Sequence, residues 1–223
     1  MIELFQITGS ASFAARMALE EAGAEYETID IHPRRRDEPA SFAEVNPLKR
    51  VPALREGDVR VYETGAVLLW IADRFPERNL GPAPGDPSRA RLYRWVLWLA
   101  DTLHPAWWPI MKSPAGEPEE PALAEIRARG RAQMDAHGAY LERELANGPW
   151  CLGETFSVAD LYLYMLVGWE SYIRGGYQLG GERVREHYRR VGERPAVVRT
   201  RELDDLDERL IRYHPELRAG RPI

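Results

Sequence analysis

The chain has 223 residues, of which 44% are hydrophobic and 29% are charged, as is typical of a soluble globular protein of one or two domains. Its apolar runs are all shorter than the roughly 20 residues that cross a bilayer, and 30 basic against 35 acidic residues argue against nucleic-acid binding. The single cysteine, Cys151, excludes an intramolecular disulfide and an all-cysteine metal site. We expect no signal peptide, no membrane partner and no metal, and therefore a cytoplasmic protein.

The N-terminal part of the chain alternates between strand and helix patterns. Short apolar or alternating runs predict strands, and apolar residues at helical spacing predict helices that end at Gly23 and before Pro76. A tight turn at residues 56–58 separates the last two strands, which predicts a hairpin. The expected strands are residues 2–7, 26–31, 51–54 and 59–62, and the expected helices are residues 12–22 and 64–75.

The clearest linker is GPAPGDP at residues 81–87, which holds three prolines and two glycines. It predicts an α/β domain at residues 1–81, a linker at 82–87 and a second domain at 88–223. Almost everything beyond the linker has helical spacing, with expected helices at residues 88–111, 122–145 and 157–173 and two shorter ones after them. The expected fold class is therefore an α/β domain followed by an all-α helical bundle.

The loop ITGSAS joins the first strand to the first helix and carries the hydroxyls of Ser10 and Ser12 close to the helix start. A helix N-terminus collects unpaired N–H groups and the positive end of the helix dipole. An anion or a thiolate is favoured there. A serine that only caps the helix produces the same pattern, so both interpretations stay open.

Val51-Pro52 opens a predicted buried strand, although proline cannot donate to a strand ladder. A cis bond there would leave the N–H and C=O of Val51 facing a groove, where an extended peptide could pair with them. A trans proline on an edge strand is the alternative, and the sequence does not set the isomer.

Glu63-Thr64 opens the second predicted helix, with Thr64 as the expected N-cap. A hydroxyl and an N–H at a helix start can bind a carboxylate, and the Glu63 side chain can hold an ammonium group. The pair fits an α-amino acid head group, although capping alone explains it as well.

The strand and helix order, together with the segments NPLKRVPAL, YETGAVLLWIADRF and FSVADLYLY, resembles the cytosolic glutathione S-transferases over nearly the whole chain. The resemblance implies a thioredoxin-like N-terminal domain, an all-helical C-terminal domain and glutathione as co-substrate. It also implies a homodimer that conjugates glutathione to an electrophilic apolar substrate, as in detoxification.

The resemblance implies glutathione contacts at Lys49, Arg50, Val51, Pro52, Glu63 and Thr64. The Val51 backbone matches the group that pairs with the cysteinyl part of glutathione, before a cis-proline. Glu63 and Thr64 match the contacts to the γ-glutamyl end. Lys49 and Arg50 lie next to this stretch, where they could meet the glycyl carboxylate.

The chain departs from the family pattern at Ala11. The loop is similar to the bacterial beta-like pattern PGxCSLxxHxALxEAG, in which a cysteine stands at the place of Ala11, and Gln6 stands where tyrosine is common. Thiol–disulfide redox chemistry through an enzyme cysteine is therefore not expected. We expect the hydroxyl of Ser10, or else that of Ser12, or backbone N–H groups alone, to favour the glutathione thiolate. A catalytically weak binding or regulatory protein of the same fold is the alternative.

Aromatic residues and one histidine gather on and after the first helix of the second domain. His104, Trp107 and Trp108 are the candidates for a second-substrate pocket, with core packing as the alternative, and the resemblance places His104 at an active-site-facing position. Ser157 and Asp160 match the family's capping box, which serves folding. Cys151 is expected to be a buried core cysteine.

Overall fold

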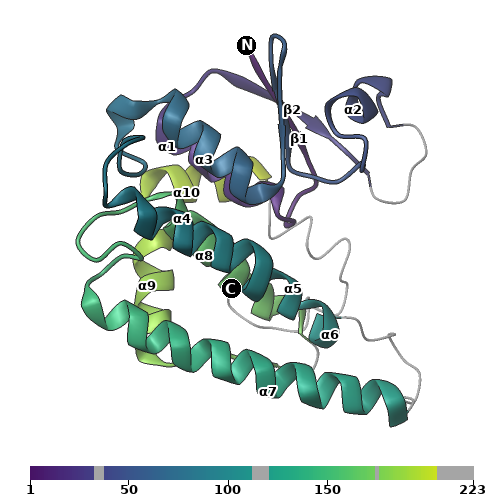
Figure 1. Cartoon of the computed structure of the whole chain (residues 1–223). Coiled ribbons are helices and arrows are strands. Elements are labelled where there is room, and N and C mark those ends of the chain that lie inside the picture. The colour runs from purple at the N-terminus through teal and green to yellow at the C-terminus, as the bar shows by residue number, and fades with distance from the viewer. Residues whose placement is uncertain (33–37, 112–120, 174–175, 205–223) are drawn as a thin grey trace. The chain divides into compact units, whose positions relative to one another are not determined.

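The computed structural model describes residues 1–32, 38–111, 121–173 and 176–204. The chain forms two compact units (Figure 1). The first contains Met1–Gly85 and, among the described residues, continues again from Gly192, while the second is Asp86–Val191.

A four-stranded sheet in the order β2-β1-β3-β4 organises the first unit. Strand β1 pairs with β2 in parallel and with β3 antiparallel, and β3 pairs antiparallel with β4, as the hairpin prediction required. This confirms the expected thioredoxin-like arrangement. The strands are β1 (Ile2–Gln6), β2 (Tyr26–Asp30), β3 (Ala53–Glu56) and β4 (Val59–Tyr62), and the helices are α1 (Ser12–Ala22), α2 (Ala40–Val45), α3 (Thr64–Arg74) and α10 (Pro195–Asp204), with a 3₁₀ turn at Pro76–Arg78.

Helices cover both faces of this sheet. Phe5 stacks on Phe42 of α2 with ring centroids 5.4 Å apart, and Ala53 joins the same apolar cluster. Since successive side chains of a strand point to opposite faces, Leu4 and Leu54 face away from α2, and both are fully buried. Helices α1 and α3 lie on that second side (Figure 1). The two-sided cover explains why β1 is a nearly continuous apolar run.

Helix α10 is part of the first unit, although the expected boundaries assign residues 88–223 to the helical domain. The α10 helix packs on α1, and Asp204 at its end forms a buried ion pair with Arg16. Before it, Arg194 donates to both carboxylate oxygens of Glu21 at 2.5 and 2.8 Å. The end of the expected helical domain, residues 205–223, lies outside the described residues.

The regular elements of the second unit are helices and helical turns throughout its described residues, and one isolated β-bridge joins Trp150 and Gly153. Its elements are α4 (Arg89–Trp98), a π-helical turn η2 (Leu99–Leu103), α5 (His104–Ala106), α6 (Trp108–Met111), α7 (Pro121–Glu144), α8 (Val158–Gly168) and α9 (Glu182–Gly192), with 3₁₀ turns at Leu145–Asn147 and Trp169–Tyr172. Ten of the 11 residues of α8 are buried, which confirms the expected central helix. No helix in the described part of the chain is long and apolar enough to cross a membrane.

The expected continuous helix at residues 88–111 is interrupted. A π-helical turn follows Trp98, and the His104 N–H bonds the Leu99 C=O, five residues back. Pro105 explains the break, because it lacks an N–H and its ring would clash with the carbonyl of Asp101 in a regular α-helix.

The capping box at the start of α8 is confirmed. Ser157 Oγ accepts the Ala159 N–H at 3.3 Å, and Asp160 Oδ2 accepts the Ser157 N–H at 2.8 Å. Cys151, predicted to be a core cysteine, is 3% exposed. Burial and the neighbouring Asp160 carboxylate raise the pKa of its thiol well above the usual value.

Candidate functional site

Three chain segments leave the sheet of the first unit at the same end. The cross-strand partners Phe5, Ala53 and Tyr62 form one row over β1, β3 and β4. Close beyond this row lie the loop at residues 7–12, the pair 51–52 and the pair 63–64. The strand register therefore brings together three of the features that the sequence singles out.

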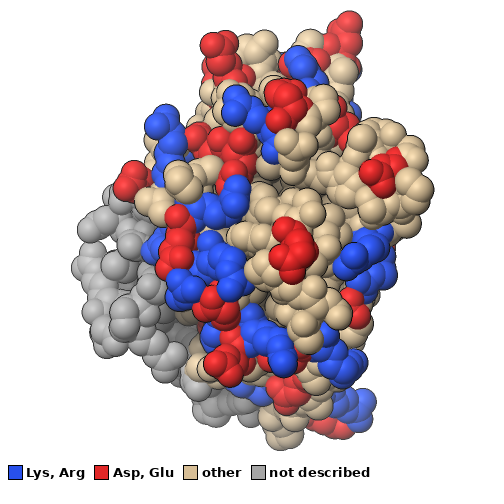
Figure 2. Space-filling view, turned by 90° about the vertical axis from the view of Figure 1, so that its left-hand side faces the viewer, with Lys and Arg blue, Asp and Glu red and all other residues tan. Residues whose placement is uncertain are grey.

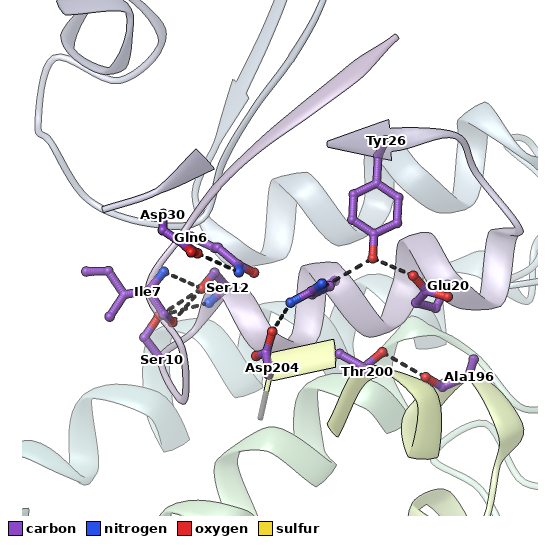
Figure 3. Close-up of polar contacts among 11 residues, drawn as sticks. Gln6, Ile7, Ser10, Ser12, Glu20, Tyr26, Asp30, Ala196, Thr200 and Asp204 are labelled. Carbon is purple, nitrogen blue, oxygen red and sulfur yellow. Dashed lines mark hydrogen bonds and ion pairs between the residues drawn. The ribbon is translucent and has the colours of Figure 1, made fainter. Parts of the chain in front are cut away.

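The loop between β1 and α1 folds into a tight turn that brings two serine hydroxyls to the Ile7 peptide groups. The Ser10 N–H donates to the Ile7 C=O at 3.1 Å, and Gly9 has the positive φ of 72° that suits this turn. Ser10 Oγ lies 2.7 Å from the Ile7 oxygen and 2.9 Å from Ser12 Oγ. Ser12 Oγ accepts the Ile7 N–H at 3.0 Å and lies 2.9 Å from the Ile7 oxygen (Figure 3).

The two serines differ in burial and in their relation to α1. Ser12 is 1% exposed, whereas Ser10 is partly exposed. The N-cap position belongs to Ala11, which offers no side-chain acceptor. The Ser12 hydroxyl bonds backward to Ile7 rather than forward to the first turn of the helix, so a cap does not explain it. Ser10 is the nearer to a cap, since its C=O accepts the Phe13 N–H at 3.0 Å and its Oγ accepts the Ser12 N–H at 3.3 Å.

Gln6 stands at the position where tyrosine is common in the family pattern described above. Its side chain is buried, and the residue is 1% exposed. Its Nε2 donates to Asp30 Oδ1 at 2.9 Å, which fixes the direction of the amide, and its Oε1 meets no hydrogen-bond partner among the described residues. A side chain so buried cannot present a hydroxyl-like donor to a ligand. Ser10 and Ser12 of this loop do carry hydroxyls.

The peptide bond between Val51 and Pro52 is cis. The residue that holds the preceding loop is Asn46, which is 1% exposed. Its Nδ2 donates to the Arg50 C=O at 2.7 Å, and its Oδ1 accepts the Leu48 N–H at 3.0 Å. Sequence reasoning missed this role, for which the Asn in NPLKRVPAL was the available signal. Neither the N–H nor the C=O of Val51 is hydrogen-bonded to any residue that the structure describes.

Lys49 and Arg50 differ in what they offer beside this segment. Lys49 has a positive φ of 51°, and its ammonium group pairs with Glu38. Arg50 is exposed, and within the described ranges its guanidinium has no ion-pair partner. Arg50 is therefore the more available cation of the two.

Glu63 and Thr64 begin α3 with an unusual backbone. Glu63 has φ 71°, a conformation that costs energy for any residue other than glycine. It is the N-cap in place of the expected Thr64, and its C=O accepts the Val67 N–H at 2.9 Å, but its side chain does not cap the helix. The shift by one residue leaves the first N–H groups of α3 without a side-chain acceptor. A carboxylate can bind there.

The three candidates in the helical unit have three different surroundings. His104 Nδ1 lies 2.8 Å from the Tyr162 hydroxyl, and its ring meets Trp169 edge-on at 4.8 Å. Burial lowers the pKa of His104 to about 4, so the imidazole is neutral at pH 7. Trp107 is fully buried and packs edge-on against Tyr177, which is the surrounding of a core residue, while Trp108 is 49% exposed.

Cys151, Asp160 and His187 place their polar atoms within 4.8 Å of one another in the helical unit. Asp160 Oδ1 accepts the Cys151 N–H at 2.7 Å and lies 2.9 Å from His187 Nε2. Its other oxygen holds the capping box, so the carboxylate is committed to local structure. Asp160 interacts with both the Cys151 thiol and the His187 imidazole, whereas activation of a nucleophile needs the histidine as its direct partner. We therefore interpret this cluster as structural: Asp160 holds the backbone at Cys151 and Ser157 and contacts His187.

Comparison with known proteins adds a family context. A model of the glutathione S-transferase N-terminal domain matches residues 1–73, and a model of the C-terminal domain matches residues 124–190. Among solved structures, a sphingomonad glutathione S-transferase complexed with glutathione is 32% identical, with a TM-score of 0.77, over 92% of this chain and 99% of that one.

Escherichia coli proteins are among the curated relatives. The glutathione S-transferase GstA is 27% identical over 88% of this chain and 95% of its own length. The disulfide-bond oxidoreductase YghU is 30% identical over 83% of this chain and 66% of its own length.

Proposed function

The chain belongs to the glutathione S-transferase family and uses glutathione as its co-substrate, and we propose that it binds glutathione at the sheet edge of the first unit. The proposal assigns the loop at residues 7–12 to the sulfur, the pair 51–52 to the cysteinyl backbone and the pair 63–64 to the γ-glutamyl end. The common end at which these segments leave the sheet supports the assignment.

The observation that carries this proposal is the open backbone of Val51. Its N–H and C=O have no partner among the described residues, and the β1–β3 ladder begins only at Ala53, two residues later. An extended peptide can add to such a segment as a short strand, with one donor and one acceptor from each side. The cysteinyl residue of glutathione supplies that pair.

The two ends of glutathione have matching charges nearby. The α-carboxylate fits the uncapped first turn of α3, where the N–H groups and the helix dipole favour an anion. The exposed Glu63 carboxylate can hold the α-ammonium group. At the other end, the exposed guanidinium of Arg50 is suited to the glycyl carboxylate, with Lys49 as a second cation already paired to Glu38.

The chemical task is to hold glutathione as a thiolate and to position it for attack on an electrophilic apolar substrate. A free thiol has a pKa of about 8.5, so a fall of one to two units gives abundant nucleophile at neutral pH. The α1 N-terminus and the serine hydroxyls provide hydrogen bonds for that purpose, and the proton goes to solvent. A neutral His104 and an exposed Trp108 suit an uncharged substrate, whereas buried Trp107 is left out.

We further propose a homodimer in the cytoplasm. Dimers are typical of the family, and α4 exposes apolar side chains at Tyr93 and Leu97, one helical turn apart. Light scattering during gel filtration tests this state. A mass of one chain across a wide concentration range would contradict it.

The experiment that tests the function combines binding and turnover. Wild-type protein should bind immobilised glutathione and conjugate it to a generic aromatic halide. Thr64→Ala should weaken glutathione binding several-fold, while the exposed control Glu77→Gln should not. Binding without turnover would favour the binding or regulatory alternative, and absence of binding would overturn the site.

A further inference from the structure

Two hydroxyl groups in the loop before α1 compete for one acceptor. The Ile7 carbonyl oxygen lies 2.7 Å from Ser10 Oγ and 2.9 Å from Ser12 Oγ, and the two hydroxyls are 2.9 Å from each other. Each hydroxyl has a single proton to donate. The three oxygens therefore form a triangle. The direction of one O–H group decides which acceptors remain for the other O–H group.

Burial makes the two serines unequal. Ser12 is 1% exposed, so its O–H can point only to the Ile7 oxygen or to Ser10 Oγ. Its lone pairs already receive the Ile7 N–H at 3.0 Å. Ser10 is partly exposed and has a third choice, which is to turn its O–H outward.

We propose that Ser12 is a positioning residue that makes Ser10 a donor to the glutathione sulfur. The Ile7 oxygen has two lone pairs, and one of them accepts the Ser10 N–H at 3.1 Å. When the Ser12 O–H donates to the other, that acceptor is satisfied and the Ser10 O–H is free to donate to the thiolate. Ser10 keeps its proton throughout, and the proton of the thiol goes to solvent. This inference rests on the proposed function and assigns different roles to two residues that the sequence could not separate.

Loss of the Ser12 hydroxyl has two consequences. The Ile7 oxygen then has only the Ser10 O–H as a hydroxyl donor, so Ser10 is drawn to the carbonyl and away from the sulfur. The Ile7 N–H also loses its acceptor, which destabilises the loop. The first consequence changes the ionisation of bound glutathione, and the second changes only stability.

The test is the pH dependence of thiolate formation in the binary complex, followed by ultraviolet absorbance. It compares wild type, Ser10→Ala, Ser12→Ala and the double variant. A hydrogen bond to a charged sulfur corresponds to about one pKa unit, or about tenfold less thiolate below the pKa. We expect each single variant to raise the apparent pKa of bound glutathione by that amount, and the double variant to raise it no further.

A matched control separates positioning from stability. Ala15→Gly lies in the same helix, at a fully buried position, and should lower the melting temperature without moving the thiolate pKa. If Ser12→Ala does not fold, Ser12→Thr replaces it and should keep the wild-type pKa, because it retains the hydroxyl. A thiolate pKa in Ser12→Thr as high as in Ser10→Ala would contradict the proposal.

Two results would overturn the inference while leaving the proposed function intact. In the first, Ser12→Ala lowers the melting temperature but leaves the pKa unchanged, so Ser12 is only structural. In the second, Ser12→Ala raises the pKa and Ser10→Ala does not, so Ser12 itself faces the sulfur. If wild type binds no glutathione, the proposed function fails together with the inference.

Discussion

Arg16 and Asp204 form a buried ion pair although 188 residues separate them. Their side chains are 9% and 1% exposed, and the same guanidinium also donates to the Tyr26 hydroxyl at 3.2 Å (Figure 3). Burial lowers the pKa of Arg16, but the bond to Tyr26 and the charge of Asp204 outweigh it and raise that pKa. The pair fastens α10 to α1, which is the helix whose N-terminus carries the serines.

Breaking this ion pair should destabilise the first unit strongly. Asp204→Asn leaves a buried guanidinium without a full counter-charge, and we expect a loss of about 3 to 5 kcal/mol in urea denaturation. The double variant Arg16→Met with Asp204→Leu should lose less, because no charge stays buried. Equal losses in the single and the double variant would show that packing of α10, rather than the ion pair, holds the helix.

Glu142 should stabilise the helical unit in a pH-dependent way. Its carboxylate accepts the N–H groups of Gly181 and Val184, both at 2.9 Å, and so caps α9 from α7. Burial raises the pKa of Glu142, but these backbone bonds outweigh it and leave the pKa below the usual 4.5. The stabilisation is thus complete above 4.5 and disappears as the pH falls through the lowered value.

We therefore expect Glu142→Gln to cost about 1 to 2 kcal/mol at pH 7 and much less in strong acid. Thermal melts at both pH values measure the difference. The exposed Glu154→Gln is the matched control and should have little effect at either pH. A cost for Glu142→Gln that stays constant into strong acid would contradict the cap.

His104 should remain neutral over the whole range in which activity is measured. Burial lowers its pKa to about 4 from 6.5, so the unfolded chain binds the extra proton first, and stability falls as the pH drops from 6.5 toward about 4. Nuclear magnetic resonance of the imidazole in the folded protein measures this titration. Titration of His104 near 6.5 would contradict its burial beside Tyr162.

Thiol reactivity should be absent from the folded wild type and should appear with one substitution. Cys151 is 3% exposed with a raised pKa, so a disulfide reagent should not label it before unfolding. Ala11 is 8% exposed, and Ala11→Cys places a thiol at the N-cap of α1, where the helix dipole lowers the thiol pKa instead of raising it. Rapid labelling of the wild type at native pH, at the same rate as Ala11→Cys, would contradict this account.

Charges of both signs are mixed on one face of the molecule. Basic and acidic side chains are interspersed on the face shown in Figure 2. Several arginines there and elsewhere are committed to carboxylates, such as Arg74 to Glu56 at 2.9 Å and Arg189 to Glu186 at 2.7 Å. The face shown in Figure 2 therefore has no basic stripe of the kind that binds nucleic acid, and the net charge of the chain, −5, is also not that of a typical nucleic-acid-binding protein.

Local patterns predict much of this fold because local chemistry determines it. The expected helix at residues 12–22 matches α1 in both bounds, since Gly23 takes the left-handed conformation that stops it. The π turn before His104 was missed, because Pro105 interrupts a segment whose apolar spacing is otherwise continuous. The place of α10 depends on Arg16 and Asp204 meeting across the chain, which no local pattern contains.

The candidate site was predictable to the level of segments rather than atoms. Motif spacing indicates Val51, Glu63 and the serine loop, and the strand register then brings them to one edge. The direction of the Ser12 hydroxyl and the burial of Trp107 depend on the packed structure, so spacing alone could not assign them. Asn46 was missed for the same reason, because its role lies in the backbone that it holds.

The central claim is that glutathione pairs with the Val51 backbone, and hydrogen exchange of the Val51 amide tests it most directly. This N–H has no partner among the described residues, so it should exchange quickly in the free protein. Saturating glutathione should slow its exchange at least tenfold, while the amide of Asp58 in the β3–β4 turn should keep its rate. Unchanged exchange at Val51 in protein that binds glutathione would contradict the account.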